Sequence, residues 1–306
     1  MQTTLKSPVS FSGVGLHSGA TVRVTVHPAS AEYGIWFRRT DIEIGDTMIP
    51  ARWDFVEISP LCTKIVNNAG VSVSTIEHIM AALAGCGIHN ALIEIDGPEV
   101  PILDGSSAKF VKAFLNRGIK TLSSPVRMVE VLKTVEVHDG ASTARFEPAH
   151  SLHIDFAIDF VDQAIGQQHK SLDMSNGTFV RELCDSRTFC RQSDVDAMHA
   201  QGLALGGTLE NAVVVDGDDI LSPGGFRHRD EAVRHKMLDA LGDLSLAGHP
   251  IMGRYTGLRA GHAMTNRLLR ALFSDTTAFR VITCGTADIA RLPGFDLHQE
   301  DLPLIA

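Results

Sequence analysis

The sequence predicts an α+β protein built from two domains of related design. At 306 residues the chain exceeds the size at which a single hydrophobic core usually stops growing, so two domains are the default. Hydrophobic residues make up 44% of the chain and charged residues 21%, a balance typical of folded proteins and not of disordered ones. Each half shows several strand patterns and a few helical patterns in a similar order, without a clear sequence repeat.

The first half begins with a strand pattern, because apolar and polar residues alternate over Thr21–His27. A helix is expected over Thr75–Ala84, ended by Gly85 and Gly87. A second helix is expected over Ser106–Arg117, where apolar residues recur at helical spacing. Short apolar runs bounded by Gly, Asn or Pro predict further strands at Gly34–Arg39, Lys64–Asn67 and Ala91–Asp96.

The domain boundary is expected in the short, polar, proline-bearing stretch Ile119–Arg127, which divides the chain into residues 1–122 and 123–306. Strand and helix patterns restart after it. Strands are expected at Val129–His138, Thr143–Glu147, Leu152–Phe160 and Phe279–Cys284, and helices at Asn176–Asp185, Asp230–Leu246 and Met264–Phe273.

Charge and cysteine content exclude several classes of protein. The formal net charge is −9 and the pI about 5.8, so the chain lacks the basic surface of a nucleic-acid-binding protein. Five scattered cysteines without a Cys-x-x-Cys pair argue against a disulfide scaffold and favour a reducing compartment. The N-terminal segment lacks an apolar signal core, and no run approaches the roughly 20 apolar residues that span a bilayer. We therefore expect a cytoplasmic protein without an integral membrane segment.

The most informative segment is RHKMLDALGD, at Arg234–Asp243. His235 and Asp239 are four residues apart on the expected helix, so both side chains leave the same face and can bind one divalent metal ion. Asp243 extends this face by another turn. The alternative is a solvated polar face with an ordinary charge pair, which is the commoner arrangement on exposed helices.

A second segment, VSVSTIEHIMAAL, places Glu77 and His78 next to each other in the first turn of a helix. A catalytic metal needs ligands and also a carboxylate that is not a ligand but takes a proton from water. An adjacent Glu–His pair can supply one of each. The alternative is a capping box over Ser74 and Glu77, in which the carboxylate would only accept a backbone N–H.

Two weaker signals complete the set. His262, in AGHAMTN at the expected start of a late helix, could give a proton to a leaving amine, although a lone histidine is more often structural. Thr188, in the segment Ser186–Phe189, offers a hydroxyl that could hydrogen-bond a developing oxyanion. By itself this second signal is very weak.

Together these segments resemble the family of UDP-3-O-acyl-N-acetylglucosamine deacetylases, zinc amidases that commit bacteria to lipid A synthesis. The resemblance runs nearly end to end, and several long motifs in the right order are far more specific than any one of them. The motifs that carry it include FSGVGLHSG, LCTKIVNNAGVSVSTIEH, GIHNALIEIDGPEVPILDGSSAKF, LGGTLENAVVVDG and DEAVRHKMLDALGD.

The resemblance implies a role for each matching residue. His78, His235 and Asp239 match the zinc ligands, with one zinc ion per chain and iron(II) as the alternative metal. Glu77 matches the general base and His262 the residue that protonates the departing amine. The remaining matches are the oxyanion-side hydroxyl of Thr188, the polar site residues Lys236 and Asp243, and the substrate-side aromatic ring of Phe189.

The resemblance also implies the architecture and the reaction. Two layered domains are expected, with their helices packed between two outer sheets, the active site at their junction and an insert forming a passage for an acyl chain. The substrate would be an acylated UDP-sugar, which loses its N-acetyl group as acetate, and Lys236 is one candidate to meet the diphosphate. We expect a monomer. The alternatives are a zinc enzyme that acts on another N-acetylated or acylated sugar and a nucleic-acid-binding module, and the net charge argues against the second.

Two positions depart from the expected family pattern. Cys190 stands where glycine is usual and is followed by Arg191, and His228 stands where an aromatic residue commonly follows arginine. None of these is a metal ligand or base in the family pattern, so the reaction is not affected. Acyl-chain preference is the property they could change, and the thiol could bind a metal adventitiously.

Overall fold

The mixed α+β class expected from the sequence is confirmed by the computed structural model, which describes residues 1–59 and 61–303. These residues form five sheets and seven α-helices. In the first half the strands are β1 (Thr3–Leu5), β2 (Val9–Val14), β3 (Thr21–Pro28), β4 (Ile35–Arg39), β5 (Met48–Pro50), β6 (Val56–Glu57), β7 (Lys64–Val66), β8 (Ser72–Val73), β9 (Ala91–Ile95) and β10 (Ile119–Thr121). The helices there are α1 (Glu77–Gly85), α2 (Ala108–Arg117) and the short 3-10 helix η1 (Trp53–Phe55).

The second half contains ten further strands and five α-helices among the described residues. The strands are β11 (Arg127–Val131), β12 (Val135–Asp139), β13 (Ser142–Glu147), β14 (Leu152–Asp159), β15 (Gln167–Asp173), β16 (Phe189–Arg191), β17 (Val213–Asp216), β18 (Asp219–Ile220), β19 (Ile251–Leu258) and β20 (Phe279–Thr283). The helices are α3 (Thr178–Glu182), α4 (Gln192–Ala200), α5 (Glu231–Ser245), α6 (His262–Ser274), α7 (Thr286–Ile289) and the 3-10 helix η2 (Gln299–Asp301).

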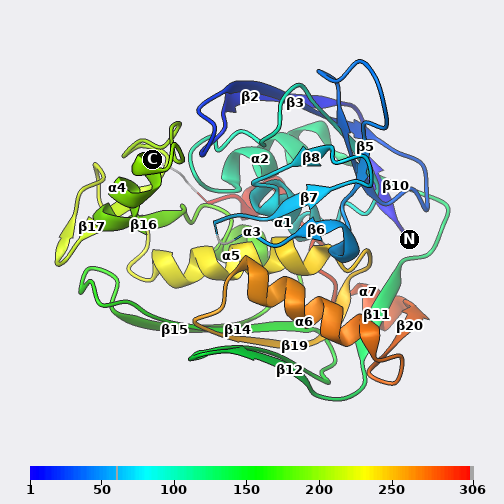
Figure 1. Cartoon of the computed structure of the whole chain (residues 1–306). Helices are drawn as coiled ribbons and strands as arrows, with labels where there is room; N and C mark the ends of the chain where they lie inside the picture. The colour runs from blue at the N-terminus through cyan, green and yellow to red at the C-terminus, as the bar shows by residue number, and fades with distance from the viewer. Residues whose placement is uncertain (60, 304–306) are drawn as a thin grey trace.

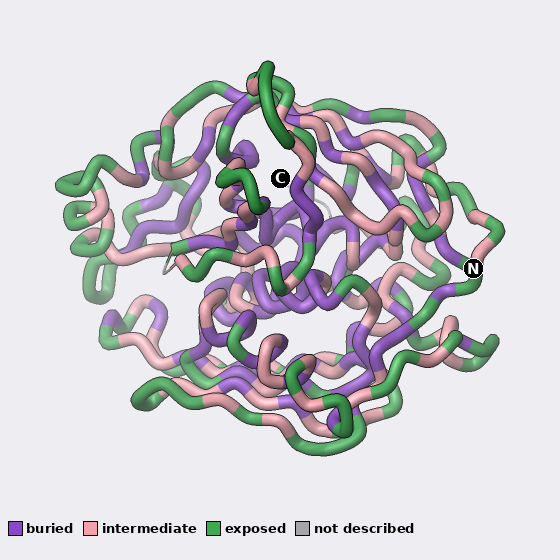
Figure 2. The backbone as a smooth tube through the Cα atoms, turned by 45° about the vertical axis from the view of Figure 1, so that its right-hand side comes forward, coloured by how far each residue is buried: buried purple, intermediate pink, exposed green. Residues whose placement is uncertain are grey.

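Each half contributes one large sheet. Five strands of the first half pair in the order β2-β3-β9-β4-β5, with β4 parallel to β9. Seven strands of the second half pair in the order β12-β13-β19-β11-β20, and β14 and β15 extend this sheet beside β19. Figure 1 shows α1, α5 and α6 in the space between the two sheets. The backbone of this central layer is largely buried (Figure 2).

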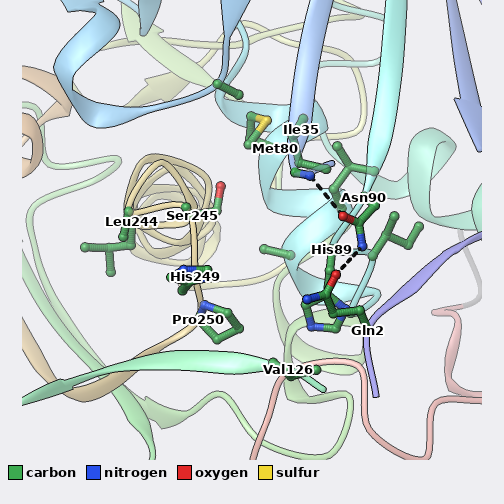
Figure 3. Close-up of a pocket in the computed structure, with 18 of the residues that line it drawn as sticks. Gln2, Ile35, Met80, His89, Asn90, Val126, Leu244, Ser245, His249 and Pro250 are labelled. Atoms are coloured by element: carbon green, nitrogen blue, oxygen red, sulfur yellow. Dashed lines mark hydrogen bonds between the residues drawn. The ribbon is translucent and has the colours of Figure 1, made fainter. Parts of the chain in front are cut away.

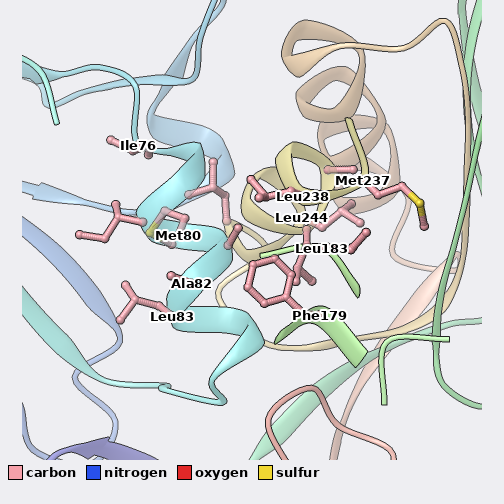
Figure 4. Close-up of a cluster of buried hydrophobic side chains, with 14 of the residues drawn as sticks. Ile76, Met80, Ala82, Leu83, Phe179, Leu183, Met237, Leu238 and Leu244 are labelled. Atoms are coloured by element: carbon pink, nitrogen blue, oxygen red, sulfur yellow. The ribbon is translucent and has the colours of Figure 1, made fainter. Parts of the chain in front are cut away.

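The central layer is held by a hydrophobic cluster that draws side chains from both halves. Phe179 and Leu183 of the α3 region and Leu238 of α5 lie between α5 and α1, whereas Met237 points away from α1, as Figure 4 shows. At the crossing of α1 and α5 a Cβ on Gly242 would come within 2.1 Å of the Glu77 carbonyl oxygen. Only glycine permits this approach, because any side chain would push the two helices apart.

The structure corrects several expected elements. The strand expected at Val129–His138 is two strands, β11 and β12, that belong to different positions in the sheet. The helix expected at Asn176–Asp185 is shorter in the structure, where α3 covers only Thr178–Glu182. The elements that the sequence missed include β15 and α4, which carry no fully buried residue and therefore lack a clear apolar period.

The boundary segment also carries more structure than expected. β10 lies in it and pairs with β1, which leaves only residues 122–126 between β10 and β11. The division into residues 1–122 and 123–306 stays a prediction, because the hydrophobic core is continuous across both parts. Among the described helices, none combines the length and apolar character that crossing a membrane requires.

Candidate metal centre and active site

The crossing of α1 and α5 brings three potential metal ligands together. His78 comes from α1, and His235 and Asp239 come from α5. Oδ1 of Asp239 lies 3.3 Å from Nε2 of His235 and 3.6 Å from Nε2 of His78. One potential ligand atom from each of the three residues lies within 4.8 Å of the others, and all three residues are buried. The reading of His235 and Asp239 as a solvated charge pair is therefore wrong.

The environment of these side chains fits a bound cation. Nδ1 of His235 donates to the carbonyl oxygen of Ser186 at 3.0 Å, which leaves the lone pair of Nε2 facing Asp239. Burial lowers the pKa of His235 to about 4, so the ring is neutral, the form that binds metals. Oδ1 of Asp239 is buried without a hydrogen-bond partner among the described residues. A buried, negatively charged oxygen is costly unless a positive charge lies beside it, and a bound metal cation would supply that charge.

Glu77 stands beside this group as the first residue of α1. Its Oε2 accepts the backbone N–H of Thr63 at 3.0 Å, and its Oε1 lies 3.9 Å from Nε2 of His262. The capping-box reading is wrong, because Glu77 is not at the third helical position and Ser74 donates its hydroxyl to the Pro98 carbonyl. Burial raises the pKa of Glu77, and the nearby His262 and His78 oppose that shift.

His262 begins α6, two residues before the helix expected from the sequence. Its Nδ1 lies 2.9 Å from Oδ2 of Asp243. As its spacing predicted, Asp243 lies one helical turn after Asp239 on α5. Burial lowers the pKa of His262, but the charges of Asp243 and Glu77 outweigh it and raise the pKa to about 9. The imidazole is therefore protonated at neutral pH and can act as a proton donor.

Thr63 contacts both Glu77 and Asp243, and the sequence analysis did not single this residue out. Its backbone N–H holds Glu77, while its hydroxyl donates to Oδ1 of Asp243 at 2.5 Å. The residue is buried, and it lies 180 positions from Asp243 along the chain. The only sequence signal is its place in the motif LCTKIVNN, and this motif does not indicate that Thr63 contacts Asp243.

The loop that carries Thr188 is fixed by close backbone contacts and a buried ion pair. The N–H of Thr188 donates to the Gly105 carbonyl at 2.8 Å. Gly105 has a φ of +83°, and a Cβ there would lie 2.0 Å from the Asn211 carbonyl oxygen, so a side chain is excluded. Arg187, the preceding residue, forms a buried ion pair with Glu231 through Nε at 2.9 Å.

A cavity of about 760 Å³ opens beside His78, His235 and Asp239, which we call the metal group. Thr188, Lys236 and Phe189 all line it. Nζ of Lys236 donates to Oδ2 of Asp239 at 2.6 Å, and the ring of Phe189 stands edge-on to His235 with 6.3 Å between centroids. The cavity continues along β16, α4 and β17, where its apolar wall is formed by Cys190, Val195, Met198, Leu203, Ala212 and Val214.

His17 is a second residue that sequence reasoning missed. Its ring lines the same cavity, and both ring nitrogens are buried without a hydrogen-bond partner among the described residues. Its backbone N–H donates to Glu99, which holds the loop in place. Burial lowers the pKa of the imidazole, so a neutral ring faces the cavity. The signal available was the motif FSGVGLHSG, which contains this histidine.

The departures from the family pattern differ in their position. Cys190 lines the cavity, but it is outside the described group of three ligands, and burial raises the pKa of its thiol to about 11. Nε of Arg191 lies 2.5 Å from Oδ2 of Asp162. His228 lies 2.9 Å from the carboxylate of Asp185. Of these three, Cys190 is the one placed to touch a ligand in the cavity.

A buried His–His–Asp group beside a carboxylate and a protonated imidazole, at the wall of a large cavity, is typical of metal-dependent hydrolases, and the fold and the site point to that class. The model of the family LpxC, UDP-3-O-acyl N-acetylglycosamine deacetylase, matches residues 2–274. The chain belongs to this family. It is an enzyme, a deacetylase of lipid A biosynthesis.

Curated relatives agree with the family match. The chain is 49% identical over 282 residues to a UDP-3-O-acyl-N-acetylglucosamine deacetylase of Phenylobacterium zucineum, covering 92% of this chain and 96% of the relative. It is 45% identical over 284 residues to the protein of the same name from Shewanella woodyi, covering 92% of this chain and 93% of the relative. The protein from Shewanella frigidimarina is 43% identical, with 92% of each chain covered.

The position of Thr63 leads to a prediction. Replacing it with valine keeps the shape and the backbone N–H but removes the hydroxyl that holds Asp243, and a hydrogen bond to a charged group contributes about 1.5–3 kcal/mol. We expect Thr63→Val to lower kcat about 10- to 100-fold with bound metal unchanged. Thr63→Ser, which keeps the hydroxyl, should stay within a few-fold of wild type. Equal losses in both variants, or no loss in Thr63→Val, would contradict the role.

Proposed function

We propose that the chain hydrolyses the N-acetyl group of UDP-3-O-acyl-N-acetylglucosamine, releasing acetate and UDP-3-O-acyl-glucosamine, the committed step of lipid A synthesis. The proposal names one zinc ion per chain, held by His78, His235 and Asp239. The observation that carries it is the oxygen of Asp239 that has no hydrogen-bond partner among the described residues and lies beside the imidazoles of His235 and His78. Two nitrogen ligands and one carboxylate suit zinc, and iron(II) is the alternative.

Zinc, when bound, supplies positive charge that lowers the pKa of water and polarises a carbonyl group. The proton of the attacking water goes to Oε1 of Glu77, the oxygen that Thr63 leaves free. Because Thr63 fixes the other oxygen, the free oxygen keeps one orientation toward the reacting atoms. The raised pKa of Glu77 brings its basicity closer to neutral pH, which favours proton transfer.

His262 gives its proton to the nitrogen that departs from the acetyl group. Asp243 holds its Nδ1, so Nε2 carries the proton that faces the site. The hydroxyl of Thr188 donates a hydrogen bond to the carbonyl oxygen as that oxygen gains negative charge. These roles of Thr188 and His262 require the acetamide to lie between the loop of Thr188 and the start of α6.

The proposed substrate orientation follows the walls of the cavity. Lys236 is the cation proposed to meet the diphosphate, although its ammonium also neutralises Asp239. Phe189 packs beside the sugar or the acyl chain, and the apolar wall along β16, α4 and β17 accommodates the acyl chain. We further propose that residues 1–122 and 123–306 are two related layered domains, and that the protein is a cytoplasmic monomer without a nucleic-acid partner.

The substrate proposal is tested by measuring acetate release from UDP-3-O-acyl-N-acetylglucosamine and from the same nucleotide sugar without its acyl chain. Because the apolar wall contacts only the acylated compound, we expect kcat/KM to be at least about 100-fold higher for it, through several buried methylene groups. Equal rates on both compounds would contradict the assignment of the cavity wall. A different acylated sugar turned over equally well would contradict the assignment of the nucleotide.

The acid and base roles predict a bell-shaped pH profile of kcat/KM. Activity should fall at low pH as Glu77 is protonated, and it should fall above about pH 9 as His262 loses its proton. Glu77→Ala and His262→Ala should each lower kcat by about 10²–10⁴-fold. His262→Ala should also remove the alkaline limb. Near-normal turnover, or a profile with both limbs intact, would defeat the role assigned to that residue.

The metal assignment predicts zinc content. After dialysis, His78→Ala and Asp239→Ala should retain much less than one zinc per chain, because each loses one of three ligands. His228→Ala is the matched control, since that imidazole pairs with Asp185 outside the group. Metal analysis alone checks this result without an activity assay. Full zinc content in both ligand variants would overturn the assignment, and iron in place of zinc would support the alternative metal.

A further inference from the structure

A second pocket lies at the other end of the α1–α5 pair. Its volume is about 470 Å³, and none of the residues that line it lines the catalytic cavity. The C-terminal parts of α1 and α5 form two of its walls (Figure 3). The side chains contributed by these two helices are Met80, Leu83, Ala84, Leu241, Leu244 and Ser245. The pocket therefore lies where elements of both halves of the chain meet, a place where small-molecule sites are common.

The lining is rich in aromatic rings. Tyr33, Trp36 and Trp53 all border the pocket, and the last two are both of the tryptophans in the chain. The ring centroids of Tyr33 and Trp36 lie 6.5 Å apart. Aliphatic side chains such as Met80 and Ile35 fill the end opposite Val126 (Figure 3). Rings and aliphatic groups around a volume of this size suit a ligand of one or two rings and not a long acyl chain.

Two histidines stand at the end of the pocket near Val126, on opposite walls (Figure 3). The backbone N–H of Thr3 donates to Nδ1 of His89 at 3.2 Å, so this nitrogen carries the lone pair. Burial lowers the pKa of His89 to about 4, which keeps the ring neutral with its proton on Nε2. That N–H donor has no hydrogen-bond partner among the described residues. The ring of His249 likewise makes no hydrogen bond with them.

The charge of the lining also favours an anion. Arg127 and Arg52 border the pocket, and Glu32 is the one acidic residue among the described residues that line it. The carboxylate of Glu32 is already engaged by Arg127 and by the amide of Gln2. Arg52 is held by the carboxylate of Asp54, which does not line the pocket, so Arg127 is the cation placed to meet an anionic ligand.

We propose that this pocket binds a small aromatic carboxylate, with its ring among the apolar side chains next to α1 and α5. Its carboxylate accepts hydrogen bonds from His89 and His249 and meets the guanidinium of Arg127. Charge-assisted hydrogen bonds of this kind fix the orientation of a ligand whose ring supplies the apolar contact area. The site is separate from the catalytic cavity, so the inference holds whether or not the proposed reaction is correct.

The two tryptophans provide a direct readout, since both line this pocket and neither lines the catalytic cavity. The experiment titrates the holoenzyme with 4-phenylbutanoate and follows tryptophan emission. We expect saturation with a Kd at or below about 1 mM. The neutral 4-phenylbutanamide, of nearly equal shape, should bind at least about tenfold more weakly because it lacks the anionic oxygens.

Variants locate the binding. Arg127→Ala and His249→Ala should each raise the Kd by at least about fivefold, because each removes one partner of the carboxylate. Arg267→Ala is the matched control, since Arg267 has similar exposure and a carboxylate partner in Asp139 but does not line the pocket. His78→Ala should leave the Kd unchanged.

Three results would overturn the inference. The first is no saturable change in tryptophan emission up to several millimolar. The second is equal affinity for the acid and the amide, which would show that the donors do not contact the ligand. The third is binding that persists in Arg127→Ala and His249→Ala but is lost in His78→Ala, which would place the carboxylate at the metal centre.

Discussion

The crossing of α1 and α5 is the contact on which the site depends. Gly242 lets the backbone of α5 touch the carbonyl of Glu77, so the two helices approach as closely as backbones can. Each helix carries part of the metal group, and neither could complete it alone. A wider crossing would separate His78 from Asp239 while leaving both helices intact. The spacing of the proposed ligands therefore depends on Gly242, a residue that has no side chain to contribute to the site.

Electrostatic compensation is the second requirement of the site. Glu77, Asp239 and Asp243 are all buried, and ionised carboxylates removed from water are costly unless positive charge or hydrogen bonds offset them. Lys236 offsets one oxygen of Asp239, and His262 together with Thr63 satisfies Asp243. The other oxygen of Asp239 has no partner among the described residues. A bound cation would complete this balance, which couples metal affinity to the stability of the helix pair.

The sequence predicted which residues lie together at the candidate site better than it predicted the fold around them. The spacing of His235 and Asp239 gave the shared helical face, but spacing cannot distinguish a solvated face from a buried one. Burial is decided by α1 and the sheets, which are distant in sequence. Thr63 was missed for the same reason, since its partner Asp243 lies 180 positions away. The strand β15 and the helix α4 were missed because exposed elements carry no apolar period.

The geometry also explains how the proposed base Glu77 and the proposed acid His262 can lie close together without transferring a proton to each other directly. Oε1 of Glu77 and Nε2 of His262 lie 3.9 Å apart, beyond hydrogen-bond distance. Glu77 is held by the N–H of Thr63, and His262 is held by Asp243, which in turn accepts the hydroxyl of Thr63. Because both restraints end on Thr63, Glu77 and His262 cannot approach each other without breaking a buried hydrogen bond. In the proposed mechanism, the attacking water loses its proton to Glu77 and the departing nitrogen receives a proton from His262 in the gap between these two side chains.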